Sequence, residues 1–192
     1  MKNKINISLS NRHIHLCRKD ADVLFGNGYE FIVRNELSQP GQYACDETVT
    51  ISGPKGAIDR VRILGPLRSA TQVEVLTSDC YKLGIQPVYR VSGDLKGSAA
   101  LTVTGPCGSI ELAEGVIVAL RHIHMNPSQA EEYGLKDKDI VSVKVPGDRG
   151  LVFDNVLVRV TESGNIDFHV DTEEGNAAGA YNSLECIIIR SL

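Results

Sequence analysis

Short segments that alternate apolar and polar residues, separated by turns rich in glycine and proline, constrain the fold of this chain more than any other feature. The 192 residues include 18 glycines and 7 prolines. A period of two residues is typical of a half-buried strand, because successive side chains of a strand point to opposite faces. The segments of this kind are INISLS, ETVTISG, VRILGP, TQVEVLT, ALTVTGP, SIELAEG, VIVALRHIH, IVSVKVPG, VFDNVLVRV, NIDFHVDT and ECIIIRSL. Many short strands joined by such turns predict a mainly β protein built from closed or nearly closed barrels.

Helices are expected to be few and short. The candidate segments are Arg18–Leu24, Ser78–Leu83, Pro127–Tyr133 and Thr172–Tyr181. The dipeptide Asn126-Pro127 is a favourable helix start, since asparagine caps the first turn and proline is tolerated at the first helical position. The stretch RNELSQPGQYACDE, residues 34–47, is expected to be a long loop.

Two faint internal repeats suggest a duplication. TVTISGPKGAI at Thr48–Ile58 resembles ALTVTGPCGSI at Ala100–Ile110, and both place Gly-Pro-x-Gly at the end of a strand. CYKLGI at 80–85 resembles part of EEYGLKDKDIVSVKV at 131–145, which has a short helix, a glycine and then a strand. We interpret the repeats as two related β modules. The alternative is that Gly-Pro-x-Gly is merely common turn chemistry.

Composition excludes several classes of protein. The net charge of −4 argues against wholesale binding of nucleic acid or of a bilayer surface. No apolar run reaches the roughly 18 residues that a membrane-spanning helix needs, and MKNKINISLS lacks the features of a signal peptide. The 5 cysteines are odd in number and form no Cys-x-x-Cys, so a reducing cytosol is expected rather than a disulfide framework.

The tetrapeptide RHIH occurs twice, at Arg12–His15 and at Arg121–His124, and uses four of the five histidines. Composition alone predicts only about 0.1 His-x-His pairs. Residues i and i+2 share a face in a strand but not in a helix, so each pair can converge on one point in extended structure. The alternative is that each histidine only forms hydrogen bonds in a half-buried strand. Because imidazole is the commonest metal ligand, two identical pairs favour metal binding.

Each pair needs at least one further ligand. The fifth histidine, His169, lies in the strand-like NIDFHVDT, and a His-x-His pair with a third histidine is typical of a catalytic zinc site with an open position. The other pair needs a carboxylate or a thiolate. Glu74 in TQVEV is one candidate, because alternation places it and Gln72 on one face while Thr71, Val73 and Val75 face the core.

Basic residues gather between positions 55 and 68. The stretch KGAIDRVRILGPLR contains Lys55, Arg60, Arg62 and Arg68 against the single Asp59. Such a strip on an acidic protein suggests an anionic ligand, since guanidinium groups match phosphate geometry. The alternative is a solvated strand edge. The chain has no P-loop and no Gly-x-Ser-x-Gly motif, so a serine nucleophile has no support.

Several longer motifs resemble the PduL-type phosphotransacylases, the phosphate propanoyltransferases and their acetyl-active relatives. They occur in order over nearly the whole chain: SNRHIHL, LSQPGQYACDETV, ILGPLRSATQVE, SGDLKG, ALRHIHMNP and GLVFDNVLVRV. The resemblance implies reversible conversion of a short-chain acyl-CoA (acetyl- or propanoyl-CoA) and inorganic phosphate into acyl phosphate and coenzyme A. It also implies two interleaved β-barrels and two zinc ions in a cleft between them.

The resemblance further implies the domain organisation. Residues 12–25 and 47–119 are expected to form one barrel, and residues 1–11 and 120–192 the other. Residues 26–46 are expected to be a connecting loop or helical region.

The resemblance also assigns roles to individual residues. It implies that His13, His15 and Glu74 bind one zinc and that His122, His124 and His169 bind the other. It gives Arg68 the catalytic, phosphate-binding role. The residues at the positions that contact coenzyme A in the family are Ser10, Asn11, Arg62, Leu64 and Asn176. Relatives often have lysine where this chain has Asn35, so coenzyme A contacts from that loop stay open.

Two other functions are weighed against this one. The chain could be a metal-dependent hydrolase that uses a zinc-bound hydroxide, or a non-catalytic module that binds zinc. A cytoplasmic protein is expected, because relatives housed in bacterial microcompartments often have an extra N-terminal segment and here the first motif begins by Ser10. Association with a microcompartment is not excluded by this argument. Acyl-chain preference and the formation of a homo-oligomer cannot be read from the sequence.

Overall fold

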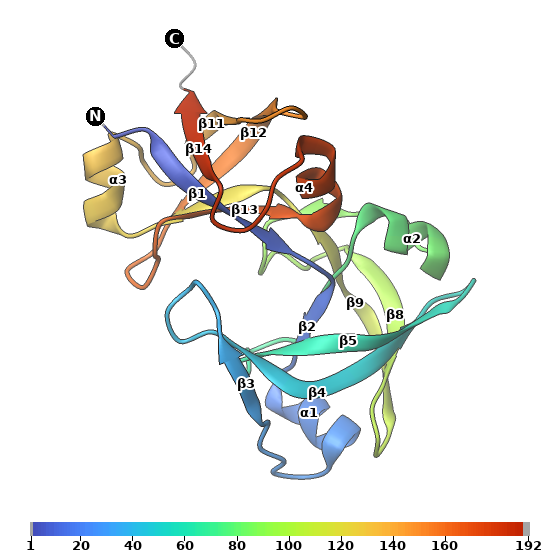
Figure 1. The fold of residues 1–192 in the computed structure, drawn as a ribbon. Coiled ribbons are helices and arrows are strands. Elements are labelled where there is room, and N and C mark those ends of the chain that lie inside the picture. Colours follow the sequence, from blue (N-terminus) through green and yellow to red (C-terminus); the bar gives the residue numbers. More distant parts are fainter. Residues whose placement is uncertain (1, 190–192) are drawn as a thin grey trace. The chain divides into compact units, whose positions relative to one another are not determined.

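The structure, a computed structural model, describes residues 2–189 and divides into two compact units (Figure 1). Unit 1 consists of Met1–Ser10, Ser38–Pro40 and Leu120–Leu192, and unit 2 consists of Asn11–Leu37 and Gly41–Ala119. The N-terminal strand thus belongs with the C-terminal half of the chain, which confirms the expected interleaving. None of the helices within residues 2–189 is long and apolar enough to cross a membrane.

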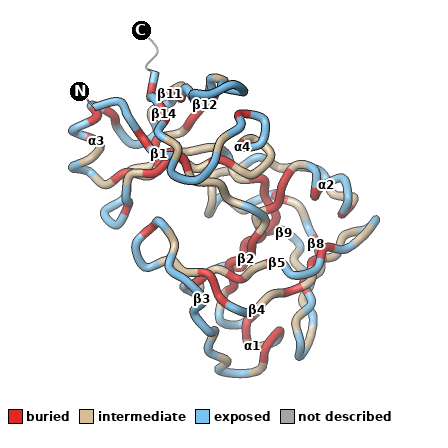
Figure 2. Tube along the Cα trace, in the orientation of Figure 1, coloured by how far each residue is buried: buried red, intermediate tan, exposed pale blue. Residues whose placement is uncertain are grey.

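Unit 1 is a closed six-stranded barrel. Its strands, in order around the barrel, are β1 (Lys4–Ser10), β13 (Asp167–Asp171), β10 (His122–Met125), β12 (Leu151–Val160), β11 (Ile140–Val145) and β14 (Glu185–Ile189). The barrel encloses a core of fully buried side chains, among them Ile7, Ile123, Val143, Val156 and Phe168. Figure 2 shows the alternation that this requires, with buried positions recurring along the strands.

Unit 2 also closes through six strands. They are β4 (Tyr43–Ser52), β5 (Ala57–Gly65), β2 (His13–His15), β6 (Gln72–Glu74), β9 (Ser109–Ala119) and β8 (Ala99–Thr104), and β8 pairs with both β9 and β4 to complete the ring. The short strands β3 (Val33–Glu36) and β7 (Tyr89–Arg90) extend the sheet from β4 and β9. Ile14, Ile51, Val61, Val73 and Val103 are fully buried inside the ring. The prediction of two small barrels is confirmed.

The four predicted helices are present and short. They are α1 (Arg18–Phe25), α2 (Thr77–Leu83), α3 (Pro127–Tyr133) and α4 (Thr172–Ala178). The Asn126 side chain accepts a hydrogen bond from the backbone N–H of Gln129 at 2.8 Å, as the predicted cap requires. α4 ends three residues earlier than predicted, because Gly179 adopts the left-handed conformation that terminates a helix.

The prediction of a long loop over residues 34–47 is wrong at both ends. β3 pairs antiparallel with the start of β4, in the register Val33↔Cys45 and Glu36↔Tyr43. All four side chains of β3 are exposed, so this edge strand has no apolar alternation by which it could be recognised. The same pairing places strands within residues 26–46, which were expected to be a connecting loop or helical region.

The tip of the turn between β3 and β4 belongs to unit 1 although its flanks belong to unit 2. The buried amide of Gln39 donates to the carbonyl of Asn165 at 2.9 Å and accepts from the Asn165 N–H at 3.1 Å. Both polar atoms of the buried side chain thus have a partner within unit 1.

The Gly-Pro-x-Gly repeat has a different meaning from the one predicted. Its two copies are the turns of the hairpins β4–β5 and β8–β9, closed by equivalent bonds from Gly53 to Gly56 and from Gly105 to Gly108, each 2.9 Å. Both hairpins lie in unit 2. The likeness therefore relates two parts of one barrel and is not evidence for one copy in each barrel.

Candidate metal centres

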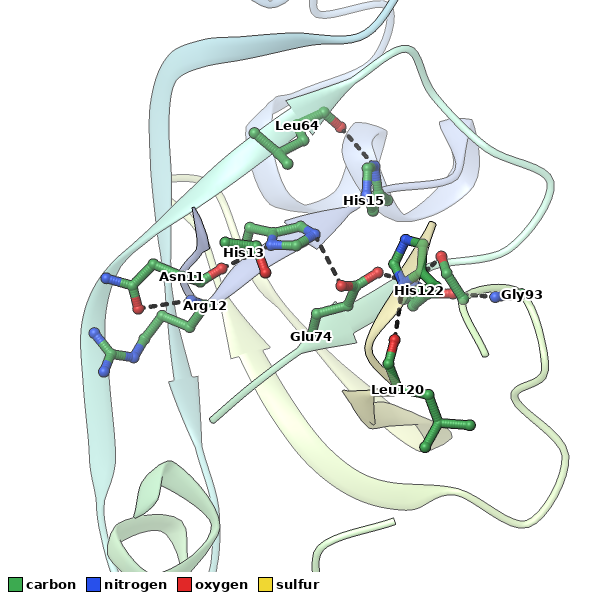
Figure 3. A network of polar contacts seen from close by, with 12 residues as sticks. Asn11, Arg12, His13, His15, Leu64, Glu74, Gly93, Leu120 and His122 are labelled. Carbon is green, nitrogen blue, oxygen red and sulfur yellow. Dashed lines mark hydrogen bonds and ion pairs between the residues drawn. The ribbon is translucent and has the colours of Figure 1, made fainter. Parts of the chain in front are cut away.

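The last three residues of the first RHIH copy, His13–His15, form β2, between β5 and β6 of unit 2. His13 lies opposite Glu74 of the antiparallel strand β6, so the third candidate ligand meets the first in register. One ligand atom from each of His13, His15 and Glu74 lies within 4.8 Å of the others. Figure 3 shows the His13 ring and the Glu74 carboxylate pointing toward one another, with the His13 Nε2 to Glu74 Oε2 distance at 3.4 Å.

Backbone carbonyls fix the tautomers of these two imidazoles. The Nδ1 atom of His13 lies 2.8 Å from the carbonyl oxygen of Asn11, and that of His15 lies 3.2 Å from the carbonyl oxygen of Leu64. A carbonyl can only accept, so each Nδ1 carries the proton and donates it. The lone pair then lies on Nε2, which is the arrangement that metal-binding histidines use.

Burial sets the protonation of these histidines. Burial lowers the pKa of His15 to about 3, assisted by the charges of His13 and Arg68, so His15 is neutral near pH 7. Burial acts in the same direction on His13, but the Glu74 carboxylate outweighs it and raises the pKa of His13. A metal ion bound at Nε2 of His13 would offer the Glu74 carboxylate a positive partner, as a proton on that atom does.

The last three residues of the second RHIH copy lie in β10, between β12 and β13 of unit 1. His122 lies opposite His169 of the antiparallel strand β13. The Nε2 atoms of His122 and His124 are 3.0 Å apart, and ligand atoms of all three histidines lie within 4.8 Å of one another. The His122 Nδ1 donates to the carbonyl of Leu120 at 2.7 Å, which repeats the bond from His13 to Asn11. Both predicted clusters are thus brought together.

Asp167 is a residue of this second cluster that was not predicted as a site residue. Its carboxylate lies 2.9 Å from the His169 Nε2 and accepts from the Ser8 hydroxyl at 2.7 Å. Burial tends to raise the pKa of Asp167, but hydrogen bonds from His169, Ser38 and Ser8 lower it below its ordinary value. The signal in the sequence was its position two residues before His169, on the same face of the strand.

Arg68 follows β5 and lies close enough to the first cluster for its positive charge to oppose the protonation of His13 and His15. Its backbone N–H donates to the Leu16 carbonyl at 2.9 Å, and its Nη1 donates to the Ser92 hydroxyl at 3.0 Å. An arginine held at main chain and side chain beside two histidines can present a fixed fork to an anion.

A buried amide links Arg68 to the candidate ligand Glu74. Gln72 donates to Glu74 Oε1 at 2.6 Å and to the Ser92 hydroxyl at 2.8 Å, and accepts from the Gly93 N–H at 2.7 Å. Ser92 therefore contacts both Gln72 and Arg68. The sequence places Gln72 on the face of Glu74, but Ser92 was not predicted as a site residue, although it begins the motif SGDLKG.

The residues predicted to contact coenzyme A lie on elements next to the clusters. In unit 2, Arg62 is the register partner of His13, and its guanidinium donates to the carbonyls of Cys45 and Asp46 at 2.9 and 2.7 Å. Leu64, two residues on, supplies the carbonyl that His15 contacts. Asn11 directly precedes β2, and Ser10 ends β1, while Asn176 lies in α4 of unit 1. Their role stays a prediction.

The donor sets of both clusters fit a divalent first-row metal. Three imidazoles, or two imidazoles and a carboxylate, are ligand sets of catalytic zinc, in which a fourth position is left for water or substrate. The Nδ1 bonds of His13, His15 and His122 satisfy the ring atoms that would not bind the ion.

Comparison with known proteins gives one consistent result. The family model described as phosphate propanoyltransferase matches residues 6–181. A phosphate propanoyltransferase of Thermotoga maritima is 57% identical over 175 residues, which cover 91% of this chain and 83% of the relative. The one of Rhodobacter capsulatus is 52% identical, and the matched residues cover 93% of this chain and 83% of the relative. The one of Clostridioides difficile is 48% identical, over 91% of this chain and 84% of the relative.

Proposed function

The chain belongs to the phosphate propanoyltransferase family and is a phosphate acyltransferase, and from this we propose that it interconverts a short-chain acyl-CoA and phosphate with acyl phosphate and coenzyme A by means of two bound zinc ions. One observation supports the metal dependence above all others: each of the two His-x-His pairs meets its own third ligand, with all ligand atoms within 4.8 Å. Acetyl-CoA and propanoyl-CoA are the proposed acyl donors.

Six residues would hold the ions: His13, His15 and Glu74 one, and His122, His124 and His169 the other. A bound zinc ion can stabilise a thiolate leaving group or polarise an oxygen of phosphate or of the thioester. Neutral His15, with its pKa near 3, offers a lone pair at neutral pH and needs no deprotonation first.

Arg68 would bind the phosphate that attacks the thioester. Ser92 accepts from one guanidinium nitrogen, so the orientation of the group is set before phosphate arrives. A planar fork can donate two parallel bonds to phosphate oxygens and lowers the repulsion between two anionic substrates. Because phosphate itself attacks the carbonyl, no acyl-enzyme intermediate is required. We further propose that Ser10, Asn11, Arg62, Leu64 and Asn176 bind coenzyme A.

The metal-dependent hydrolase and the non-catalytic zinc module are the competing functions. The distinguishing experiment measures initial rates of coenzyme A release from acetyl-, propanoyl- and butanoyl-CoA, with and without phosphate, and detects acyl phosphate directly. We expect release to require phosphate and to match acyl phosphate formation one for one. Release at equal rates without phosphate would favour the hydrolase, and absence of release from every thioester would favour the zinc module. Treatment with a chelator followed by zinc tests the metal, since activity should be lost and then recovered.

A further inference from the structure

The arginine of each RHIH copy forms an ion pair that the roles proposed above leave unused. Arg12 Nε lies 2.7 Å from Asp79 Oδ2, and Arg121 Nε lies 2.7 Å from Glu174 Oε1. The side chain of Asp79 is only 6% exposed and that of Glu174 is 21% exposed. Exposed ion pairs contribute little, but a pair with a buried carboxylate is costly to break.

The two acidic residues occupy the same structural position. Asp79 and Glu174 each follow the third ligand of their cluster, Glu74 or His169, by five residues. Each is the third residue of the helix that begins after that ligand's strand, α2 or α4.

Each carboxylate also contacts the main chain between the ligand strand and the helix. Asp79 Oδ2 accepts from the N–H of Leu76 at 3.0 Å, and Glu174 Oε2 accepts from the N–H of Asp171 at 3.3 Å. Leu76 and Asp171 are each two residues beyond the third ligand of their cluster.

In each barrel one carboxylate thus links the His-x-His strand to the strand of the third candidate ligand. It contacts the arginine next to the first strand and the main chain just beyond the second. The arginine directly precedes the first histidine and so lies at the start of the His-x-His strand. The carboxylate that it contacts is bound to the segment just beyond the third ligand. Sliding of the His-x-His strand against the third ligand's strand would have to break the ion pair.

Arg121 has two further contacts that hold it in place. Its Nη1 donates to the carbonyl of Asp154 at 3.1 Å, and its guanidinium lies 5.0 Å from the centre of the Phe153 ring. Arg12 has the more buried carboxylate partner instead. Both barrels therefore have an arginine–carboxylate pair at the same position, although the other contacts of the two arginines differ.

We propose that Arg12–Asp79 and Arg121–Glu174 are positioning pairs, each of which fixes the spacing of the three metal ligands in its own barrel and acts on that metal site alone. The inference rests on the proposed function, because it requires that the two clusters bind metal. The pairs do not touch the ion. They act through the strand register, in the way that outer-shell partners hold ligands in place, and changes to such partners typically lower metal affinity about ten- to hundredfold.

The test isolates one cluster at a time in the full chain. A His122→Ala/His124→Ala background leaves the His13–His15–Glu74 cluster, and a His13→Ala/His15→Ala background leaves the other. Into each background we would introduce Asp79→Asn or Glu174→Gln. Both amides keep the size and the oxygen that accepts the main-chain N–H, but lack the charge that pairs with arginine. Zinc affinity is measured by competition with a chromophoric chelator.

Asp79→Asn should weaken zinc binding about ten- to hundredfold in the first background and change it less than about twofold in the second. Glu174→Gln should do the reverse. Arg12→Ala should match Asp79→Asn, and the double variant should bind zinc no more weakly than either, because both changes remove the charge attraction of the same ion pair. Arg18→Ala is the matched control, since it breaks the Arg18–Asp22 pair at 2.9 Å, whose two residues both lie on α1.

The thermal midpoint of each metal-free variant separates a positioning role from general destabilisation. Unchanged zinc affinity in Asp79→Asn and Glu174→Gln would overturn the proposal, as would equal weakening by either variant in both backgrounds. Absence of zinc binding in both backgrounds, before either substitution is made, would instead overturn the metal assignment itself.

Discussion

The two ligand clusters share one frame but place their carboxylate differently. In both, a His-x-His strand pairs antiparallel with the strand of the third ligand, in the registers His13↔Glu74 and His122↔His169. In unit 2 the carboxylate is the third ligand, Glu74, and the residue two positions earlier is the amide Gln72. In unit 1 the third ligand is His169 and the carboxylate, Asp167, is two positions earlier.

This difference in the position of the carboxylate would change the net charge of each metal site. A zinc dication bound by two neutral imidazoles and Glu74 keeps one net positive charge, and one bound by three neutral imidazoles keeps two. The first cluster recovers positive charge from Arg68, which acts electrostatically on His13 and His15. The second has Asp167 beside His169, where a carboxylate raises the basicity of the ligand without binding the ion. With an ion bound in each, the first cluster together with Arg68 would therefore be the more positively charged site, and the second together with Asp167 the less positively charged one.

Removal of a ligand should have the largest effect and should act on one cluster only. We expect His122→Ala or His169→Ala to lower bound zinc from about two ions per chain to about one, with the first cluster still filled, and His13→Ala to do the converse. Turnover should fall by more than about a hundredfold in each, since ligands matter more than their outer-shell partners. Elemental analysis and steady-state kinetics would check this. Loss of both ions from a single substitution would show that the clusters are not independent.

Arg68 should come next, with a defect confined to phosphate. Charge-assisted hydrogen bonds contribute roughly 1.5–3 kcal/mol, so loss of one made mainly in the transition state lowers turnover at least about tenfold. Arg68→Lys should fail as Arg68→Ala does, because an ammonium cannot reproduce the fork. Kinetics at varied phosphate, and at varied acyl phosphate in reverse, would measure it. The exposed Arg60 of the same basic strip is the control. A defect in coenzyme A affinity alone would contradict the assignment.

The outer partners Gln72 and Asp167 sharpen the comparison, because each should affect its own cluster. We expect Asp167→Asn to weaken zinc at the three-histidine cluster about tenfold, and Gln72→Ala to weaken it by a similar factor at the Glu74 cluster. Gln72→Ala should also raise the Michaelis constant for phosphate, since Gln72 and Arg68 share Ser92. Chelator competition and phosphate titrations would follow both. If either variant weakened zinc binding equally at both clusters, Gln72 and Asp167 would not be partners of one cluster each.

The central isoleucines of the two RHIH copies should show the smallest effect, and an equal one. Ile14 and Ile123 are both 0% exposed and point into the core of their barrel. Ile14→Val and Ile123→Val should each lower the free energy of unfolding by about 0.5–1.5 kcal/mol, the usual cost of one buried methyl group. Urea denaturation of the metal-free protein, with the exposed Ile32→Val as control, would measure this. A much larger loss in one variant would show that the barrels differ in how well they repack.

Local sequence patterns predicted most of the strands and helices and several of the candidate ligands. Alternation marked the long strands, and a capping asparagine with proline marked the start of α3, because these signals lie within a few neighbouring residues. The His-x-His spacing by itself predicts two metal sites, since the two imidazoles of such a pair converge only when the segment is a strand. Alternation also placed Glu74 opposite the core. The pairing of each third ligand with its own RHIH copy came from family resemblance, and the geometry agrees with it.

Tertiary structure decided what depends on residues distant along the chain. The exposed edge strand β3 is defined by hydrogen bonds to β4 and has no pattern of its own. The Gly-Pro-x-Gly likeness proved to lie within one barrel because turn chemistry repeats wherever hairpins do. Three pairs of equivalent positions hold chemically different side chains: Glu74 and His169, Gln72 and Asp167, and Asp79 and Glu174. Their equivalence is visible only in the shared register, because strand pairing conserves positions in space while the residue types at those positions can change.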